Sequence, residues 1–304
     1  MFDVLVAGEI NPDLILRGNI EPEFGQVEKL VESAELTIGS SSAIFACGAA
    51  RLGLKVGFIG MCGDDVFGRF MQDEMQKRGV DTSNIIIRPG RSTGLSVILN
   101  RSYDRAILTF PGLISALQAS DIPDALLQQA RPLHVASYFL QERLQRDLPA
   151  LFQRAHSAGL TTSLDTNYDP SGRWAGFDEL LPATDIFLPN EIEALSIAHS
   201  EDIEVAARQL AKEASLVVVK LGAAGALACQ QASMIRAASI SVDARDAIGA
   251  GDTFDAGFVF GYLNHWDLQK SLRIACVCGA LSMRRAGGTD GQPTLKEAMQ
   301  YVPG

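Results

Sequence analysis

Short runs of apolar residues recur along the chain, and each is followed by a glycine or aspartate turn and a longer segment with helical periodicity. Such apolar or β-branched runs are typical of strands that are buried on both faces. The alternation predicts an α/β fold, with a doubly wound, mainly parallel sheet between two layers of helices in a three-layer αβα arrangement. We predict strands at residues 4–7, 56–59, 133–136, 161–164, 186–188, 216–221 and 226–228, and helices at 42–52, 68–78, 143–157, 201–214 and 253–263.

Two segments, 11–38 and 84–111, interrupt this alternation. Within the second, apolar runs at 95–99 and 106–110 are separated by a polar stretch at 100–105, which predicts a β-hairpin. We expect the two segments to form a small β-sheet lid that excludes water from a site beneath it. The α/β core would then comprise residues 1–10, 39–83 and 112–304.

Composition narrows the classes of partner. The chain has 304 residues, of which 47% are apolar and 20% are charged, and its formal net charge is −10. An acidic chain without clustered Lys and Arg is expected to bind neither nucleic acid nor an anionic membrane. The first residues carry no basic leader, and no apolar run has the length of a membrane span. We therefore expect a soluble, cytoplasmic protein with one principal domain.

Familiar motifs of other enzyme classes are missing from the chain. It contains no G-x-x-x-x-G-K-[ST] loop, no G-x-G-x-x-G turn and no G-x-S-x-G elbow. P-loop enzymes, dinucleotide dehydrogenases and serine hydrolases are therefore not expected. The five cysteines lack metal-ligand spacing and are predicted to be reduced, mostly buried thiols. The four histidines have no motif around them and are predicted to be surface or packing residues.

The turn formed by Gly249, Ala250 and Gly251 carries the clearest chemistry. It precedes a run of small and apolar residues that predicts a buried helix, with Asp252 at its start. Small residues let backbone N–H groups converge at a helix N-terminus, where the helix dipole favours an anion such as phosphate. A carboxylate beside that anion would be repelled unless it had a role, such as accepting a proton from an attacking hydroxyl. The local segment leaves a second interpretation open, in which Asp252 only caps the helix.

The sequence from near residue 4 to near residue 297 resembles the ribokinase-like (pfkB) carbohydrate kinases. The most specific stretch is D-A-I-G-A-G-D-T-F at 246–254, which is similar to the family signature D-[TS]-[TV]-G-A-G-D-x-F. The resemblance implies an ATP-dependent kinase in which Asp252 is the catalytic base. It also implies that the N–H groups of Gly249, Ala250, Gly251 and Asp252 hold the phosphoryl group during its transfer.

On the acceptor side, G-E-I-N-P-D at 8–13 resembles the segment whose Asn and Asp bind sugar hydroxyls, which implies substrate-binding roles for Asn11 and Asp13. The stretch 39–53 resembles the N-terminal signature of the family, which implies that Gly39 and Ser40 also bind the substrate. Ser40 could instead cap the helix that follows, and both interpretations stay open.

The sequence departs from the family pattern at two positions on this side. Ile38 replaces the first Gly of a pair, and Ile44 replaces an Asn. An apolar group in place of a sugar-facing amide does not favour ribose as the acceptor. The D-T-N segment at 165–167, with Trp174 downstream, resembles a stretch beside the active cleft and adds Asn167.

The resemblance also implies sites for ATP and Mg²⁺. N-E-I-E at 190–193 matches the N-x-x-E motif, in which Asn190 and Glu193 would organise magnesium-bound water; an acidic helix start is the alternative. V-V-V-K-L-G-A-A-G at 217–225 resembles the strand and turn that seat ATP. This implies that Lys220, Gly222 and Gly225 contact ATP. The resemblance also implies that the helix containing Cys276 closes over the adenine, so Cys276 is a further expected contact.

A monovalent cation is a further implication. In many family members the backbone near the positions of Asp246 and Ile248 helps to bind K⁺, so a K⁺ requirement is left open. Arg105 and Phe110 of the predicted lid are expected to shape the acceptor pocket. A homodimer through the lid and a monomer are both left open.

Three functions remain on the sequence alone. The first is phosphoryl transfer to a sugar or a sugar-like alcohol. The second is an adenosine-type nucleoside kinase, because the apolar Ile44 and Phe110 would suit a base. The third is a catalytically idle binding protein of the same fold. The retained Asp252, Asn190 and Glu193 argue against the third.

Overall fold

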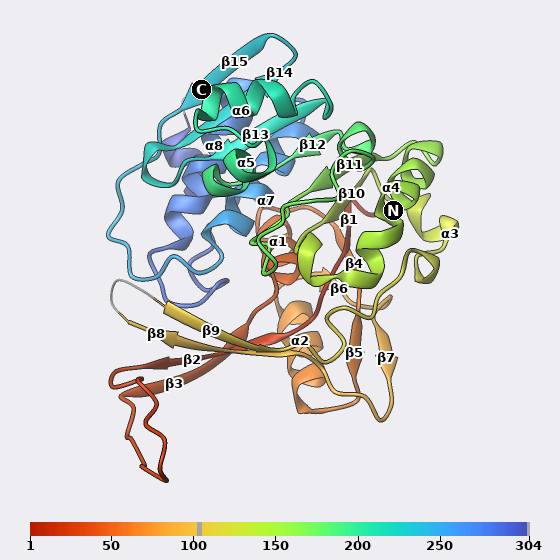
Figure 1. Cartoon of the computed structure of the whole chain (residues 1–304). Coiled ribbons are helices and arrows are strands. Elements are labelled where there is room, and N and C mark those ends of the chain that lie inside the picture. The colour runs from red at the N-terminus through yellow and green to blue at the C-terminus, as the bar shows by residue number, and fades with distance from the viewer. Residues whose placement is uncertain (102–104, 303–304) are drawn as a thin grey trace.

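The large sheet fixes the architecture of the molecule (Figure 1). The computed structural model describes residues 1–101 and 105–302. Its main sheet has nine strands in the order β15-β14-β13-β12-β11-β10-β1-β4-β6, which are parallel except for the antiparallel edge formed by β13, β14 and β15. This confirms the predicted doubly wound fold. The strands are β1 Val4–Ala7, β4 Val56–Ile59, β6 Val80–Asp81, β10 Pro132–Val135, β11 Thr161–Leu164, β12 Ile186–Phe187, β13 Leu216–Lys220, β14 Ala226–Gln230 and β15 Ser233–Ala237.

Helices cover both faces of this sheet. In β1, Leu5 and Ala7 belong to one apolar cluster whereas Val4 and Val6 belong to another, because successive side chains of a strand point to opposite faces. One face packs against α3 Asp124–Leu127, α4 Glu142–Ser157, α5 Glu191–Ile197 and α6 Ile203–Leu210. The other packs against α1 Ser41–Arg51, α2 Val66–Lys77, α7 Ala250–Leu263, α8 Leu268–Ser282 and α9 Leu295–Ala298.

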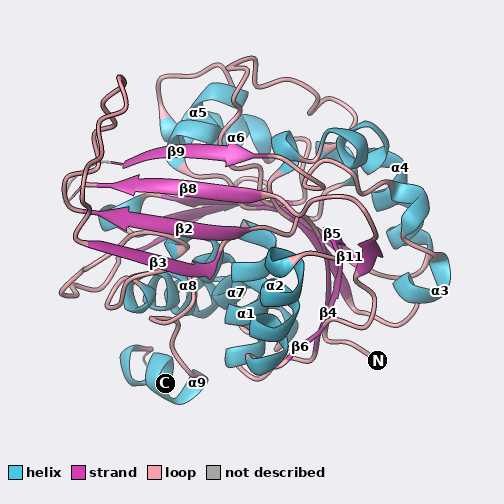
Figure 2. Ribbon diagram, turned by 90° about the horizontal axis from the view of Figure 1, so that it is seen from below, coloured by secondary structure: helices cyan, strands magenta, loops and turns pink. Residues whose placement is uncertain are grey.

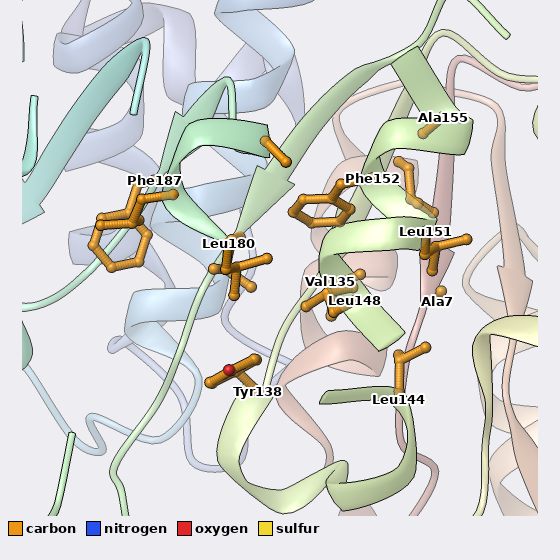
Figure 3. Packing of buried hydrophobic residues seen from close by; sticks show 14 of the residues in the cluster. Ala7, Val135, Tyr138, Leu144, Leu148, Leu151, Phe152, Ala155, Leu180 and Phe187 are labelled. Carbon is orange, nitrogen blue, oxygen red and sulfur yellow. The ribbon is translucent and has the colours of Figure 1, made fainter. Parts of the chain in front are cut away.

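Helix α4 illustrates how sequence pattern becomes packing (Figure 3). Its buried residues recur at the spacing of one helical face, and they belong to the same apolar cluster as Val135, Leu180 and Phe187. The polar residues between them stay at the surface. The buried residues are Leu144, Leu148, Leu151, Phe152 and Ala155.

Helices α7 and α8 pack unusually closely because glycines line their contact. A Cβ on Gly257 would lie 3.0 Å from the Cα of Ala275, and one on Gly261 would lie 2.7 Å from the hydroxyl of Ser271. No larger side chain fits either position without moving the partner helix. The close packing holds the N-terminus of α7 in a fixed place beside the sheet.

A second sheet lies apart from the first (Figure 2). It has the order β3-β2-β8-β9, formed by β3 Ser33–Ile38, β2 Pro12–Arg17, β8 Leu95–Asn100 and β9 Arg105–Phe110, and we call it the lid sheet. The predicted hairpin is present as the antiparallel pair β8 and β9. Residues 102–104 of the polar stretch between the two strands, like 303 and 304, lie outside the described residues. Ile15 and Ile98 of the lid sheet pack against Ile248 of the core.

Part of segment 84–111 pairs elsewhere. Strand β7 (Ile86–Arg88) is parallel to β5 (Met61–Gly63) in a separate two-stranded sheet. All five cysteines are buried and unpaired, as predicted. His134 is buried against the ring of Phe45, with ring centroids 3.6 Å apart, which confirms a packing role. Among the described residues, no helix has both the length and the apolar character needed to cross a membrane.

Candidate active site

The turn before α7 depends on the glycine that precedes the helix. Gly249 is the N-cap of α7 and has a φ of 70°, a conformation that side chains disfavour. A Cβ there would also come within 2.9 Å of Gly288 and Ile44. Asp252 lies inside the first turn and is not the cap, so the capping interpretation does not describe it. The first amides of this 14-residue helix form an N-terminus of the kind that attracts anions.

Asp252 is an unusual carboxyl group for this position because it is buried, with 8% of its surface exposed. Burial raises the pKa of Asp252 to about 7, and the negative charge of Asp165 adds to that shift. Lys220 and the Ser41 hydroxyl lower the pKa of Asp252 but do not outweigh burial. A carboxyl group that titrates near neutral pH is suited to accepting a proton.

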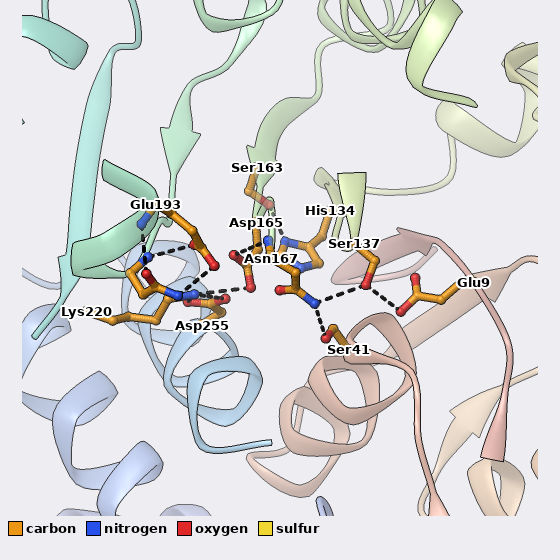
Figure 4. A network of polar contacts seen from close by, with 11 residues as sticks. Glu9, Ser41, His134, Ser137, Ser163, Asp165, Asn167, Glu193, Lys220 and Asp255 are labelled. Carbon is orange, nitrogen blue, oxygen red and sulfur yellow. Dashed lines mark hydrogen bonds and ion pairs between the residues drawn. The ribbon is translucent and has the colours of Figure 1, made fainter. Parts of the chain in front are cut away.

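Lys220, at the end of β13, lies in a cluster of buried charges (Figure 4). Its Nζ is 3.1 Å from Asp165 Oδ2 and 3.0 Å from Asp255 Oδ2. Burial alone would lower the pKa of Lys220, but the charges of Asp165 and Asp255 raise it further than burial lowers it. Burial, followed by the charge of Asp165, raises the pKa of Glu193 to about 7. Carboxyl groups therefore outnumber ammonium groups in this cluster, which favours an added cation.

Asn190 and Glu193 form a reciprocal helix cap at the start of α5. Asn190 Oδ1 accepts from the Glu193 N–H at 2.9 Å, and Glu193 Oε2 accepts from the Asn190 N–H at 2.8 Å. The alternative of an acidic helix start is therefore observed. The Glu193 carboxylate caps the helix and still belongs to the cluster, because its negative charge raises the pKa of Lys220.

A cavity of about 720 Å³ lies beside this cluster and the turn. It brings together four of the residues expected to contact ATP, namely Lys220, Gly222, Gly225 and Cys276, and it reaches Gly251. Burial raises the pKa of Cys276 to about 12, so its thiol is neutral. The remaining wall is largely apolar, as suits a planar base. It is formed by Ile240, Val242, Ala250, Phe254, Ala280 and Met283, among others.

Outside the residues that line this cavity, the start of β2 presents polar side chains. Asn11 Nδ2 donates to Asp13 Oδ1 at 3.3 Å and to Ser96 Oγ at 3.4 Å. Gly39 makes room for this arrangement, because a Cβ there would lie 2.1 Å from Asp13 Oδ1. Burial raises the pKa of Asp13 to about 7, although the charge of Arg105 lowers it in part. The structure thus brings Asn11, Asp13 and Gly39 together.

Asn167 joins this side through a chain of hydroxyl groups (Figure 4). Its Nδ2 donates to Ser137 Oγ at 3.1 Å and also to Ser41 Oγ, and Ser137 donates to Glu9 Oε1 at 2.9 Å. Ser137 has a φ of 52°, in the left-handed region that is costly for serine, and Asn167 has a φ of 56°, which asparagine adopts more readily. Strained backbone of this kind clusters at functional sites. Because Ser41 also bonds to Asp252, the chain of contacts reaches the proposed base.

Three expected substrate contacts are not brought into this group. Ser40 Oγ donates to the Glu9 carbonyl at 2.7 Å and accepts from the Ala43 N–H at 3.0 Å, so it acts as the helix cap. Phe110 follows Thr109 in β9 and therefore points to the opposite face of the lid sheet, where 55% of its surface is exposed. Arg105 lines a separate cavity near the far end of that sheet, and its charge lowers the pKa of Asp13 in part.

Sequence reasoning did not assign roles to Glu9, Asp165 and Asp255, which contribute buried carboxyl groups at or near the site. Asp255 could have been found from its spacing, because it lies one turn after Asp252 on the same face of α7. Glu9 and Asp165 lie within the segments 8–13 and 165–167 that the resemblance picked out, but no sequence signal assigned either carboxyl group a role. The partners of Glu9 are distant in sequence.

Comparison with known proteins gives a consistent answer. Residues 1–295 match the sequence model described as pfkB family carbohydrate kinase. The chain is 29% identical over 305 residues to the ATP-dependent ribose-1-phosphate kinase of Halopiger xanaduensis, covering 99% of this chain and 98% of that protein. It is 27% identical over 283 residues to the 5-dehydro-2-deoxygluconokinase of Geobacillus thermodenitrificans, covering 87% and 84% respectively.

A solved structure extends the likeness to three dimensions. Adenosine kinase from Sinorhizobium meliloti superposes with a TM-score of 0.86 and 24% identity, covering 98% of this chain and 98% of that one. At this identity the likeness shows the fold alone. Since the family model spans almost the whole chain, the chain belongs to the pfkB family and is a carbohydrate kinase with a ribokinase-like fold.

Proposed function

We propose that this enzyme transfers the γ-phosphoryl group of ATP to a hydroxyl of a sugar or sugar-like small molecule, with Asp252 as the catalytic base. The observation that carries the proposal is the position of Asp252. This buried carboxyl group has a pKa of about 7 and lies in the first turn of α7, between the cavity at Gly251 and the hydroxyl chain at Ser41. A base between a nucleotide site and an acceptor site can take the proton of an attacking hydroxyl.

The proposed reaction is an in-line displacement. The acceptor oxygen attacks the γ-phosphorus, the bond from that phosphorus to the β–γ bridging oxygen breaks, ADP leaves, and Asp252 receives the hydroxyl proton. The amides at Gly249 to Asp252 would stabilise charge on the transferring phosphoryl oxygens. The apolar walls of the 720 Å³ cavity would hold the adenine base.

Mg²⁺ would be held through water near Asn190 and Glu193. Mg²⁺ prefers oxygen ligands and keeps several waters, and the carboxyl-rich cluster around Lys220 supplies the negative charge that it needs. Over residues 1–101 and 105–302, no three His, Cys, Asp or Glu side chains converge to hold a metal directly. The proposal is therefore for binding through water.

The lid sheet would close the acceptor side. Asp13 and Asn11 would bind acceptor hydroxyls, with Gly39 and Asn167 beside them, because carboxylate and amide groups fix hydroxyl directions. The same face of the lid sheet carries Ser96 and Thr109, whose hydroxyl groups are 3.0 Å apart. We assign the lid sheet the role of excluding water from the reaction.

The acceptor can be identified with a thermal-shift panel in the presence of a non-hydrolysable ATP analogue. The panel would contain pentoses, hexoses, sugar acids, ribose 1-phosphate, 5-dehydro-2-deoxygluconate and nucleosides, because only a true ligand stabilises the fold by mass action. Each compound that shifts the melting temperature is then assayed for ATP consumption. Binding without ATP consumption across the panel would instead indicate a catalytically idle protein.

A nucleoside acceptor is the second candidate, and one cavity favours it. A space of about 880 Å³ extends from Thr109 of the lid sheet to Tyr138 and Phe139. These two aromatic side chains suit a base, whereas much of the remaining wall is polar or charged and Asp252 does not line the cavity. Ile44 no longer supports this interpretation, because it packs against Gly288 and the turn. A panel in which only nucleosides raise the melting temperature would decide for this candidate.

We also propose a homodimer through the lid sheet. Its outer face carries an apolar row that crosses all four strands, formed by Leu36, Leu14, Val97 and Leu108 in register. Leu108 and Phe110 on this face are 61% and 55% exposed. A second copy of the same face would cover this surface. Leu108→Glu should then convert a dimer to a monomer in analytical ultracentrifugation, and a monomeric wild type would contradict the proposal.

A further inference from the structure

The carboxylate of Asp246 connects three parts of the molecule. Its Oδ1 accepts from the Ile248 N–H at 3.0 Å, and its Oδ2 accepts from the Gly287 N–H at 3.3 Å and from Arg17 Nη2 at 3.2 Å. Only 4% of the side chain is exposed. The group therefore joins the lid sheet, the turn that leads into α7 and the loop after α8.

Arg17 is directed to this position by the lid sheet itself. It ends β2, on the same face as Asp13 and Ile15, because the side chains of a strand alternate. Ile15 packs against Ile248, which brings this end of the strand close to the turn. Arg17 Nη1 also donates to Glu35 Oε2 at 3.1 Å, which fixes the orientation of the guanidinium group from the neighbouring strand.

This arrangement can be tested for its fit to a monovalent cation. The family resemblance places such a cation near the backbone of Asp246 and Ile248, which lies beside the Asp246 carboxylate. The negative charge of that carboxylate would favour a cation there if it were not already paired. Here Asp246 Oδ2 faces a guanidinium group and an amide, and both are donors. A second positive charge beside the Arg17 guanidinium group would be repelled by it. The residues of this chain do not fit a bound K⁺.

We propose that Arg17 supplies, from within the chain, the positive charge that a monovalent cation would otherwise provide, and that it ties the lid sheet to the phosphoryl-binding turn. Arg17 is a positioning residue, because it acts through Asp246 and the backbone that leads to Gly249. That the turn binds phosphate rests on the proposed function. The ion pair itself does not, so the two ideas can fail separately.

The first test compares K⁺ with choline as chloride salts at matched ionic strength, using thermal unfolding as a readout that needs no substrate. We expect the wild-type melting temperature to be the same in both salts. Arg17→Ala should be less stable in choline and should regain stability in K⁺, because removing the guanidinium group leaves Asp246 open to a small cation. Arg17→Lys keeps a charge and should show a weaker K⁺ response. Arg69→Gln removes an exposed arginine of the ion pair with Asp64 and should behave as wild type.

The second test repeats the comparison with the phosphorylation assay. Wild-type kcat/KM should differ by less than about 2-fold between the two salts, whereas Arg17→Ala should fall about 10-fold in choline and recover in K⁺, the size expected for a lost charged hydrogen bond. A K⁺-specific stabilisation or activation of the wild type would overturn the proposal. So would an Arg17→Ala variant that gains no K⁺ response in either assay.

Discussion

The two halves of the active site are built in different ways. The phosphoryl half depends on backbone: one contiguous turn, 249–252, at the N-terminus of a helix that close glycine contacts hold against α8. The acceptor half depends on side chains from several strand ends and from both sheets, connected by hydroxyl and amide contacts. The first half is therefore set by the fold, whereas the second can change by single substitutions that leave the fold intact. Under the proposed function, the residues for the chemistry and those for the choice of acceptor are separated in space.

The halves also differ in charge. Around Lys220 several ionisable groups are buried together, so each charge depends on its neighbours. Around Asn167 the partners are mainly hydroxyl groups, which rotate to suit a ligand at little cost. A change in the first group should therefore affect catalysis or folding, while a change in the second group should mainly affect the choice of acceptor.

Asp252→Asn should have the largest effect on catalysis. Removing the base while keeping its shape should lower kcat at least ~10²-fold, with the KM for ATP nearly unchanged. Steady-state ATP consumption measures this effect, and exposed Asp243→Asn is the matched control. Near-wild-type turnover of the Asp252→Asn variant would remove Asp252 from the mechanism.

Unfolding measurements can show that this loss is catalytic. The pKa of Asp252 is raised from 3.8 to about 7 in the folded state. As pH rises from 4 to 7, the unfolded chain loses this proton first, so the carboxyl group increasingly destabilises the fold. At pH 8 the Asp252→Asn variant should therefore be at least as stable as the wild type.

Lys220→Met should have the largest effect on stability. It would leave Asp165 and Asp255 buried without their ammonium partner, and breaking a buried pair in this way costs about 3–5 kcal/mol. Denaturant titration measures the loss. Lys77→Met, which removes the exposed ion pair with Glu74, should change the midpoint little. Equal midpoints for the two variants would mean that the Lys220 cluster is not the buried network described here.

The same division explains how much the sequence could predict. The strands at 4–7, 56–59 and 161–164 appear at those residues, because continuous apolar runs have few alternatives inside a parallel sheet. Strand β15 was not predicted, since its residues are mostly not buried and carry no continuous apolar run. The antiparallel edge of the sheet was missed with it. The contiguous turn at 249–252 was predicted for the same reason as the strands: its signal is local.

The acceptor half was harder to predict because its geometry is not local. Ser137 lies 128 residues from Glu9 along the chain, and only the completed sheet brings the two together. Phe110 shows a second limit. A shift of one residue along a strand exchanges the two faces of a sheet, so sequence could not tell that Thr109 faces the site and Phe110 faces away.

Asp13→Asn should change acceptor affinity with little effect on the phosphoryl half. Replacing the Asp13 carboxylate, which accepts hydrogen bonds, with an amide should raise the KM for the sugar about 10-fold or more. The kcat and the KM for ATP should change less. Thr37→Val is the control, because Thr37 is buried to a similar degree and pairs in register with Asp13 from the neighbouring strand β3. An unchanged sugar KM for Asp13→Asn would place the acceptor elsewhere.

The pH profile should separate the two halves most directly. Because the base must be ionised, kcat/KM should level off about one pH unit above the pKa of about 7 and fall about tenfold per pH unit well below that pKa. Asp13 also has a pKa of about 7, so the wild-type profile alone does not identify the group. The profile of Asp13→Asn does, since its acidic limb should remain if the limb belongs to Asp252. A flat profile in that variant would assign the titration to the acceptor half and leave Asp252 without evidence of ionising during the reaction.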